Sequence, residues 1–381
     1  MQVFALSNYD EFSCIGSQCP YTCCRGWKIH IDEESLERYH SVSGEIGNEM
    51  RDSILIDENK NACIKLNEDG FCPLLNEQNL CRIYIEAGED KMCNTCQTYP
   101  RGVNIYGDFY MKYICISCPE VARILFSQKE PLQFHIVEDE NILMPQIAGF
   151  NWEYFNALKD GMFTTIHILQ NRTLPINVRI QMTLFFNDLF QDCLSKKGNT
   201  NEIITMFTHQ DTIHLILKNL QRFPRKMDYF ERIILEFNRQ LVTKSDNIWD
   251  IMEFIEAAIK EFQKNENRDH LSLAEFMNSE RVCNIFENYC VYYVIQHYLK
   301  SYEKMNPQKC IVKMIHFCVI FAWLFGLYGS QKTLEDYTII VSLFSRKTEH
   351  CFNDDSIFDV ICDSLCEQGM GTTDYLLSIL A

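Results

Sequence analysis

Cysteine is the residue type in this chain with the most evident chemical potential, and it is unevenly distributed. The sequence has 381 residues and 19 cysteines, and 11 of the cysteines fall within the first 118 residues. Thiolates are preferred ligands of zinc and of the iron in iron–sulfur clusters. Residues 1–10 have neither the basic nor the apolar stretch of a secretory signal, and the cysteine number is odd. We therefore expect reduced thiols, metal ligands or redox groups here rather than a disulfide framework.

Two groupings of these cysteines have spacings that suit a metal site. One grouping is Cys14-x4-Cys19-x3-Cys23-Cys24 followed by Cys72-x8-Cys81. The other is Cys93-x2-Cys96 followed, after 18 residues, by Cys115-x2-Cys118, which is the spacing of a four-thiolate zinc site. Zinc and a [4Fe–4S] cluster both accept four thiolates in tetrahedral arrays, so the spacing leaves both open. Cys63 and the eight later cysteines are expected to be small buried hydrophobic residues.

The first 126 residues predict short, irregular structure. Residues 27–32 alternate like a strand, and Asp32 is placed to cap a helix through Tyr39. Residues 103–114, interrupted at Gly107-Asp108, predict a β-hairpin. A small domain without long apolar helices commonly needs a metal for stability. We therefore predict a Cys-rich metal-binding domain over residues 1–126.

The rest of the chain predicts helices. Residues 127–147 carry two prolines and an acidic run, which indicates a connecting segment. Apolar residues then recur at helical spacing, for example over 227–241 and 248–262. The most apolar stretch, 317–328, is shorter than the roughly 20 residues of a membrane span and predicts a buried core helix. The predicted fold class is α+β, mainly α, with an all-α domain over residues 148–381.

Composition narrows the classes of function. Hydrophobic residues make up 47% and charged residues 23%, which is typical of a globular protein, and the net charge is −17. Such a charge disfavours nucleic acid and favours a basic, lysine-bearing partner. The sequence contains no Gly-x-Gly-x-x-Gly loop, P-loop, Gly-x-Ser-x-Gly or His-Glu-x-x-His motif. A hydrolase, a nucleotide-driven enzyme and the common dinucleotide-type methyltransferase fold are therefore not predicted.

Six short motifs give the chain a family resemblance. The motifs are 12–19 (FSCIGSQC), 23–27 (CCRGW), 71–75 (FCPLL), 80–83 (LCRI), 95–101 (TCQTYPR) and 117–120 (SCPE). In order and spacing they closely resemble the N-terminal part of the flagellin lysine-N-methylases, over residues 12 to about 123. More broadly, this part resembles the Cys-rich zinc- or iron-chelating domain of small bacterial proteins.

The resemblance implies a function and a ligand set. It implies a [4Fe–4S] cluster, methyl transfer from S-adenosylmethionine to flagellin lysines, and a bacterial cytoplasmic location. Cys93 and Cys115 fall outside the motif pattern, which weakens the simple zinc interpretation. The implied metal ligands come from eight motif cysteines: Cys14, Cys19, Cys23, Cys24, Cys72, Cys81, Cys96 and Cys118.

Lysine methylation requires particular side chains at the site. The amine has an ordinary pKa of about 10.4 and must be neutral to react, so burial or a base must favour its deprotonation. The carboxylates Asp32 and Glu120 and the phenols Tyr99 and Tyr113 are candidates to orient the ammonium group or to take its proton. Each has a purely structural alternative, such as Glu120 capping a helix.

Arg101 is the candidate for holding the methionine carboxylate of the cofactor, because its guanidinium is a forked donor. It is also a candidate catalytic residue, and Trp27 is a second candidate cofactor contact. The structural alternatives are that Arg101 pairs with a local acid and that Trp27 packs on the metal site. An alternative function also stays open, in which zinc stabilises a non-catalytic module and the helical domain docks a protein partner.

Overall fold

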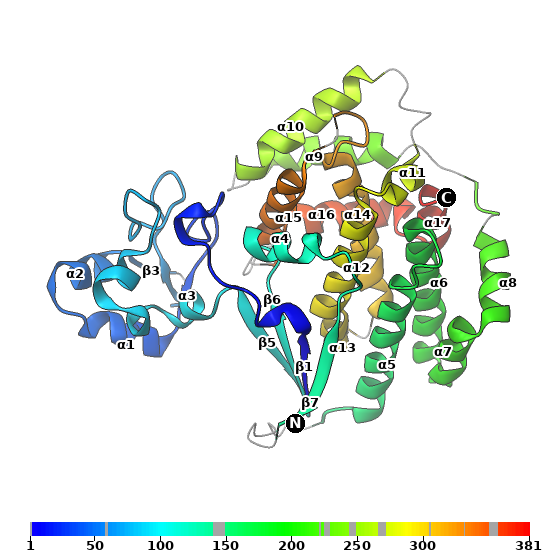
Figure 1. Cartoon of the computed structure of the whole chain (residues 1–381), viewed down its shortest axis with the longest axis horizontal. Coiled ribbons are helices and arrows are strands. Elements are labelled where there is room, and N and C mark those ends of the chain that lie inside the picture. Colours follow the sequence, from blue (N-terminus) through cyan, green and yellow to red (C-terminus); the bar gives the residue numbers. More distant parts are fainter. Residues whose placement is uncertain are drawn as a thin grey trace.

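The computed structural model describes most of the chain and is mainly helical, with a small strand-containing N-terminal region, which confirms the predicted fold class. Three parts are visible: a cysteine-rich lobe built between residues 10 and 100, a four-stranded sheet, and a large helical half (Figure 1). The described residues are 2–57, 60–139, 149–220, 222–224, 229–243, 249–265, 272–304, 306–330, 332–349 and 357–381.

The cysteine-rich lobe contains short elements joined by loops. Asp32 begins α1 as predicted, because its carboxylate accepts a hydrogen bond from the backbone N–H of Ser35 at 2.9 Å. Tyr39 of α1 and Met50 of α2 are buried in the small core of the lobe. The strand predicted over 27–32 is shorter in the structure. The elements are η2 (Gly16–Gln18), β2 (His30–Ile31), α1 (Glu33–Ser41), α2 (Gly44–Asp52), β3 (Ile54–Ile56), β4 (Ala62–Ile64), η3 (Ile83–Ala87), η4 (Glu89–Lys91) and α3 (Asn94–Thr98).

A four-stranded sheet lies between the lobe and the helices (Figure 1). Its order is β5-β6-β1-β7, with β1 parallel to β6 and antiparallel to β7. The predicted hairpin is confirmed, because β5 and β6 pair across a turn at Gly107, whose φ is +57°. Strand β7 lies inside the segment expected to be a connection, and residues 140–148 lie outside the described part. The strands are β1 (Gln2–Leu6), β5 (Arg101–Tyr106), β6 (Phe109–Ile114) and β7 (Phe134–Glu138).

The inner face of this sheet continues into the helical core. Phe4 and Phe109 contact each other at a ring distance of 6.0 Å, and Phe109 meets Phe155 of α5 at 6.3 Å. The helix that follows β6, α4 (Pro119–Ser127), begins at Cys118 as its N-cap residue and has Pro119 in its first turn. One hydrophobic core thus joins the N-terminal sheet to the helices.

Helices form over both predicted stripes, and Phe230, Ile234 and Ile255 are buried as predicted. Met227 and Ile248, at the start of the two predicted stripes, lie outside the described residues. The longer helices are α5 (Trp152–Leu169), α6 (Ile176–Ser195), α7 (Thr200–Thr208), α8 (Gln210–Leu220), α9 (Tyr229–Thr243), α10 (Trp249–Lys264), α12 (Cys283–His297), α14 (Pro307–Leu324), α15 (Leu334–Glu349) and α16 (Ile357–Leu365). The shorter elements are η1 (Ser7–Tyr9), α11 (Leu273–Asn278), η6 (Tyr298–Lys300), α13 (Ser301–Lys304), η7 (Cys366–Met370) and α17 (Thr373–Ile379).

Helix α14 is the predicted core helix, although it begins ten residues before the predicted start and ends at Leu324. Of the helices that the structure describes, it is the one long and apolar enough to cross a membrane on length and composition alone. Its apolar window is 78% buried inside the fold. The helix therefore belongs to the protein core.

His316 on α14 gives a prediction for the pH dependence of stability. Its Nδ1 lies 2.6 Å from the Tyr229 hydroxyl, and burial lowers its pKa to about 4. The unfolded chain binds a proton at this histidine below about pH 6.5, and the folded chain does so only near pH 4. Stability should therefore fall as the pH drops from about 6.5 towards 4. Proton uptake by this histidine in the unfolded chain should make the free energy of unfolding about 2 kcal/mol lower at pH 5 than at pH 7.

The measurement is urea unfolding of the wild type and of His316→Gln at pH 7 and pH 5. The glutamine variant cannot take up this proton. Its free energy of unfolding should therefore fall less between pH 7 and pH 5 than that of the wild type, by the same amount of about 2 kcal/mol. Equal losses in the two proteins would show that His316 is not the responsible group.

Candidate metal centre

All eight motif cysteines line one cavity of about 700 Å³ in the cysteine-rich lobe, where the lobe meets α4. Of the described cysteines among the first 118 residues, only Cys63, Cys93 and Cys115 are not part of its lining. The cavity therefore separates the cysteines into the two groups that the family resemblance implies. We call it the cysteine cavity.

Four separate segments bring these cysteines together. The loop over residues 12–24 carries the first four, and its Cys24 carbonyl accepts a hydrogen bond from the Cys72 N–H at 2.8 Å. Cys81 pairs with Leu75 in an isolated bridge, which closes the turn after Cys72. Cys96 lies on α3, and Cys118 is the N-cap of α4. The backbone thus places distant parts of the sequence around one space.

Burial raises the pKa of several of these thiols and so keeps them protonated. It raises the pKa of Cys72 and of Cys118 to about 12, so each is neutral at physiological pH unless a cation binds. The adjacent pair behaves differently, because a hydrogen bond from the Cys24 thiol lowers the pKa of Cys23 to about 7 despite burial. A bound metal ion deprotonates its thiol ligands, so the buried cysteines can become thiolates when they coordinate one.

The donor set fits a soft metal, because eight thiols face one space and neither histidine of the lobe, His30 or His40, lines it. The thiols are not already gathered. Across the described ranges, no group of three or more Cys, His, Asp or Glu side chains is close enough to hold a metal ion. Coordination by four of them requires side-chain rotation or a small loop movement.

Trp27 and Tyr99 line the cysteine cavity together. Their ring centroids are 5.3 Å apart, and the Tyr99 hydroxyl lies 3.1 Å from the Ser117 Oγ. Burial raises the pKa of Tyr99 well above its usual value, so this phenol stays neutral. Tyr99 is therefore suited to orient a ligand and is a poor proton acceptor.

Arg101 and Glu120 also line the cavity, and both have structural partners. Arg101 donates to the Phe12 carbonyl at 2.9 Å and lies over the Phe12 ring. Glu120 accepts two hydrogen bonds from Arg123, at 2.7 and 2.6 Å. Binding a cofactor carboxylate or an ammonium group would mean sharing or exchanging these contacts.

The other two proposed acid–base residues are not at the cavity. Asp32 caps α1, and the hydrogen bonds from Ser35 favour its charged form. Tyr113 pairs with Gly102 in the β5–β6 hairpin, and burial raises its pKa to about 12. Neither position supports a direct role for these residues in the site.

Sequence analysis missed two cations that reach the lobe from α15. Arg346 donates to the carbonyls of Tyr21 and Thr22, and Lys347 donates to the carbonyl of Gly26. These contacts join residues more than 300 positions apart in the sequence. Sequence spacing carries no signal for such pairs, so only the fold could identify them.

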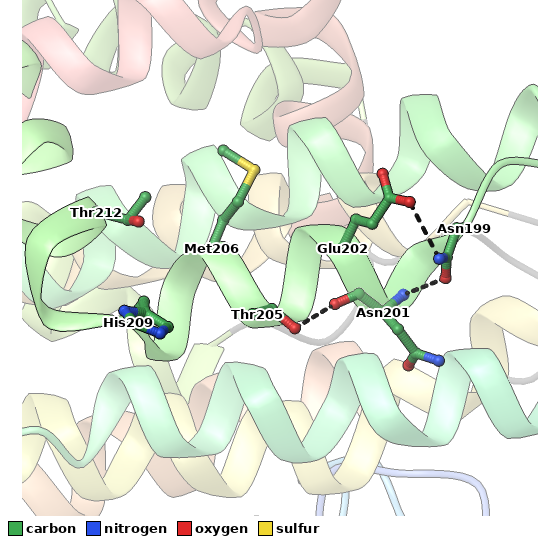
Figure 2. Close-up of a pocket in the computed structure, with 7 residues that line it drawn as sticks. All are labelled: Asn199, Asn201, Glu202, Thr205, Met206, His209 and Thr212. Carbon is green, nitrogen blue, oxygen red and sulfur yellow. Dashed lines mark hydrogen bonds between the residues drawn. The ribbon is translucent and has the colours of Figure 1, made fainter.

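A second hollow, of about 400 Å³, lies at α7 in the helical half (Figure 2). Its polar groups mostly bond to one another: Asn199 donates to Glu202 at 3.1 Å and accepts from the Asn201 N–H at 3.2 Å, as helix-capping residues do (Figure 2). Cysteine is absent from its lining. Of the two hollows, the cysteine cavity is therefore the candidate functional site.

The match that identifies the family lies in the helical half. Residues 163–379, which are more than half of the chain, match the family described as the FliB lysine N-methylase C-terminal domain. The chain belongs to the FliB lysine N-methylase family. Membership in this family supports lysine N-methylation as the class of reaction. The predicted resemblance is thereby confirmed by the half of the chain that carries none of the six motifs.

Individual relatives agree with the family assignment. The chain is 36% identical over 121 residues to the flagellar biosynthetic protein FliU of Salmonella muenchen, a match that covers 30% of this chain and 72% of that protein. It is also 36% identical over 121 residues to a lysine-N-methylase of Salmonella typhimurium, covering 30% of each. An uncharacterized protein of Methanocaldococcus jannaschii is 25% identical over 241 residues, covering 60% of this chain and 79% of that protein. No solved structure matches the chain.

Proposed function

We propose that this member of the FliB family N-methylates lysine ε-amines of flagellin, with S-adenosylmethionine as the methyl donor and a [4Fe–4S] cluster held in the cysteine cavity. The observation that carries the proposal is the presence of all eight motif cysteines on one cavity. The zinc-stabilised docking module remains the alternative, because zinc accepts the same thiolates.

The proposed methyl transfer is a displacement at the methyl carbon, in which one bond forms and one bond breaks. The lysine Nζ lone pair forms a bond to the methyl carbon as the carbon–sulfur bond breaks, and the electron pair of that bond goes to sulfur. S-adenosylmethionine supplies the electrophilic methyl group on its sulfonium. The amine must lose its proton before attack, so the site must favour the neutral amine.

Several residues of the cysteine cavity suit this task. The aromatic faces of Trp27 and Tyr99 attract a cation such as an ammonium or sulfonium group. The neutral Tyr99 hydroxyl can accept a hydrogen bond from the lysine. Buried apolar walls, including Ile64 and Leu74, lower the polarity and so favour loss of the amine proton.

The cluster would connect the segments that form the cavity. When bound, it supplies four metal–thiolate bonds and a compact inorganic core. The chain itself provides eight thiols, six of them on loops, one within α3 and one at the start of α4. Cross-linking four of those thiols would hold the walls of the cavity in place.

Flagellin is the proposed substrate, and the bacterial cytoplasm before export is the proposed location. The name of the relative FliU links it to flagellar biosynthesis. The net charge of −17 would attract a lysine-bearing surface, although salt screens this attraction beyond about 8 Å.

Co-expression with flagellin from the same organism tests this function. Flagellin produced with the protein should gain mass in steps of one CH2 group by intact-mass spectrometry, and peptide mapping should place the added groups on lysines. Flagellin produced alone is the control. Unshifted flagellin, in the presence of folded, metal-loaded protein and S-adenosylmethionine, would exclude flagellin as the substrate.

A further inference from the structure

Helix α15 of the helical half extends its C-terminal turn towards the cysteine cavity. The helix packs against α4, which begins at the cavity residue Cys118. Arg346 lies in this turn and is 3% exposed. A buried guanidinium requires hydrogen-bond partners, and Arg346 finds them in the cysteine-bearing segments.

Three carbonyl groups accept hydrogen bonds from Arg346. Its Nη1 donates to Thr22 at 2.9 Å and its Nη2 donates to Tyr21 at 2.7 Å. Its Nε donates to Ser117 at 3.2 Å. The planar fork of a guanidinium fixes the directions of these bonds, so the three carbonyls are held in one arrangement.

Each of these carbonyls lies next to a cavity cysteine. Tyr21 and Thr22 lie between Cys19 and Cys23, and Ser117 directly precedes Cys118. The segment that bears Cys118 has a further attachment to the helical half. The backbone N–H of Ile116 donates a hydrogen bond to the Tyr292 hydroxyl at 3.0 Å. Two walls of the cavity are thus fastened to one side chain.

We propose that Arg346 is a positioning residue of the metal centre: it holds the loop bearing Cys19 and Cys23 and the segment bearing Cys118 in one arrangement around the cysteine cavity, from which rotation of the side chains can bring the thiols to one metal. The inference rests on the proposed metal role of the cysteine cavity. It means that the helical half, which carries the family match, sets the geometry of a site built from the lobe.

Cobalt(II) binding to the metal-free, full-length protein tests this role, because Co²⁺ reports its thiolate ligands by absorption. The Arg346→Lys variant keeps the positive charge but loses the planar guanidinium that donates to three carbonyls at once. We expect Co²⁺ affinity to fall about 10- to 100-fold, as for other residues that orient metal ligands. The sulfur-to-cobalt charge-transfer band at saturation should also be weaker, because fewer thiols reach the ion.

Arg51→Lys is the matched control. Arg51 also donates to backbone carbonyls of the lobe, including that of Val42 at 2.8 Å, but none of its acceptors flanks a cysteine of the cavity. This variant should bind Co²⁺ with the affinity and spectrum of the wild type. Thermal unfolding of all three metal-free proteins measures any general loss of stability.

The outcomes separate the two proposals. If the wild type binds Co²⁺ through thiolates and Arg346→Lys gives the same affinity and spectrum, Arg346 has no positioning role and the metal proposal survives. The positioning role is equally overturned if the variant is less stable but its saturated spectrum is unchanged. If the wild type binds no Co²⁺ through thiolates, the metal role of the cavity is overturned and this inference with it.

Discussion

Cys118→Ala and Cys96→Ala should each lose the metal and the methylation activity together. Both thiols line the cysteine cavity; Cys96 lies within α3 and Cys118 is the N-cap residue of α4. Removing a ligand from a four-thiolate centre leaves an incomplete coordination shell, and metal binding to such sites is coupled to folding of the surrounding segment. The measurement is metal content of the purified variants, followed by their activity on flagellin.

Cys115→Ala and Cys93→Ala are the matched controls. Cys115 is 6% exposed and Cys118 is 8% exposed, three residues apart, yet only Cys118 lines the cavity. The control variants should keep their metal. The simple two-pair zinc site predicts instead that all four cysteines are needed. Loss of metal from all four variants would therefore favour that site. Metal retained by Cys118→Ala would exclude Cys118 as a ligand and would contradict the two-pair zinc site.

Glu287→Ala should destabilise the helical half by about 3–5 kcal/mol. Glu287 on α12 is fully buried and accepts from Arg179 at 2.5 Å and from Arg172 at 2.8 Å. Arg179 is itself buried on α6, so removing the carboxylate leaves an uncompensated positive charge inside the core. Urea unfolding followed by circular dichroism measures the loss.

An exposed ion pair gives the control for this prediction. Asp192 and Lys196 pair at 2.7 Å one turn apart on α6, with side chains 60% and 72% exposed. Asp192→Ala should cost less than about 1 kcal/mol, because water and salt screen such pairs. If Glu287→Ala unfolds at nearly the same urea concentration as Asp192→Ala, the buried pair of Glu287 and Arg179 does not stabilise the core as described.

The parts of the fold that depend on local sequence patterns could be predicted. Asp32 as the cap of α1, the hairpin turning at Gly107, and the buried helix α14 each depend on a few neighbouring residues. Strand β7 was not predicted, because its pairing with β1 joins segments more than 120 residues apart. Long-range pairing of this kind leaves little trace in a short window of sequence.

In the candidate site too, some residues could be predicted from sequence motifs, whereas others are placed only by long-range contacts of the fold. The eight cavity cysteines follow from the motif resemblance, and the cavity brings all of them together. The roles suggested for Asp32 and Tyr113 came from residue type alone, and the fold places both away from the cavity. Arg346 had no sequence signal, since its three acceptors are backbone carbonyls, which any residue type can supply.

Iron and sulfide analysis of the full-length protein, purified without oxygen, tests the metal centre most directly. The proposed [4Fe–4S] cluster predicts a brown protein with iron and acid-labile sulfide in equal amounts, four of each per chain. Stoichiometric zinc without iron would contradict the cluster and establish the four-thiolate zinc module. Protein free of both metals, with the cavity cysteines all reactive towards a thiol reagent, would contradict any metal centre in the cysteine cavity.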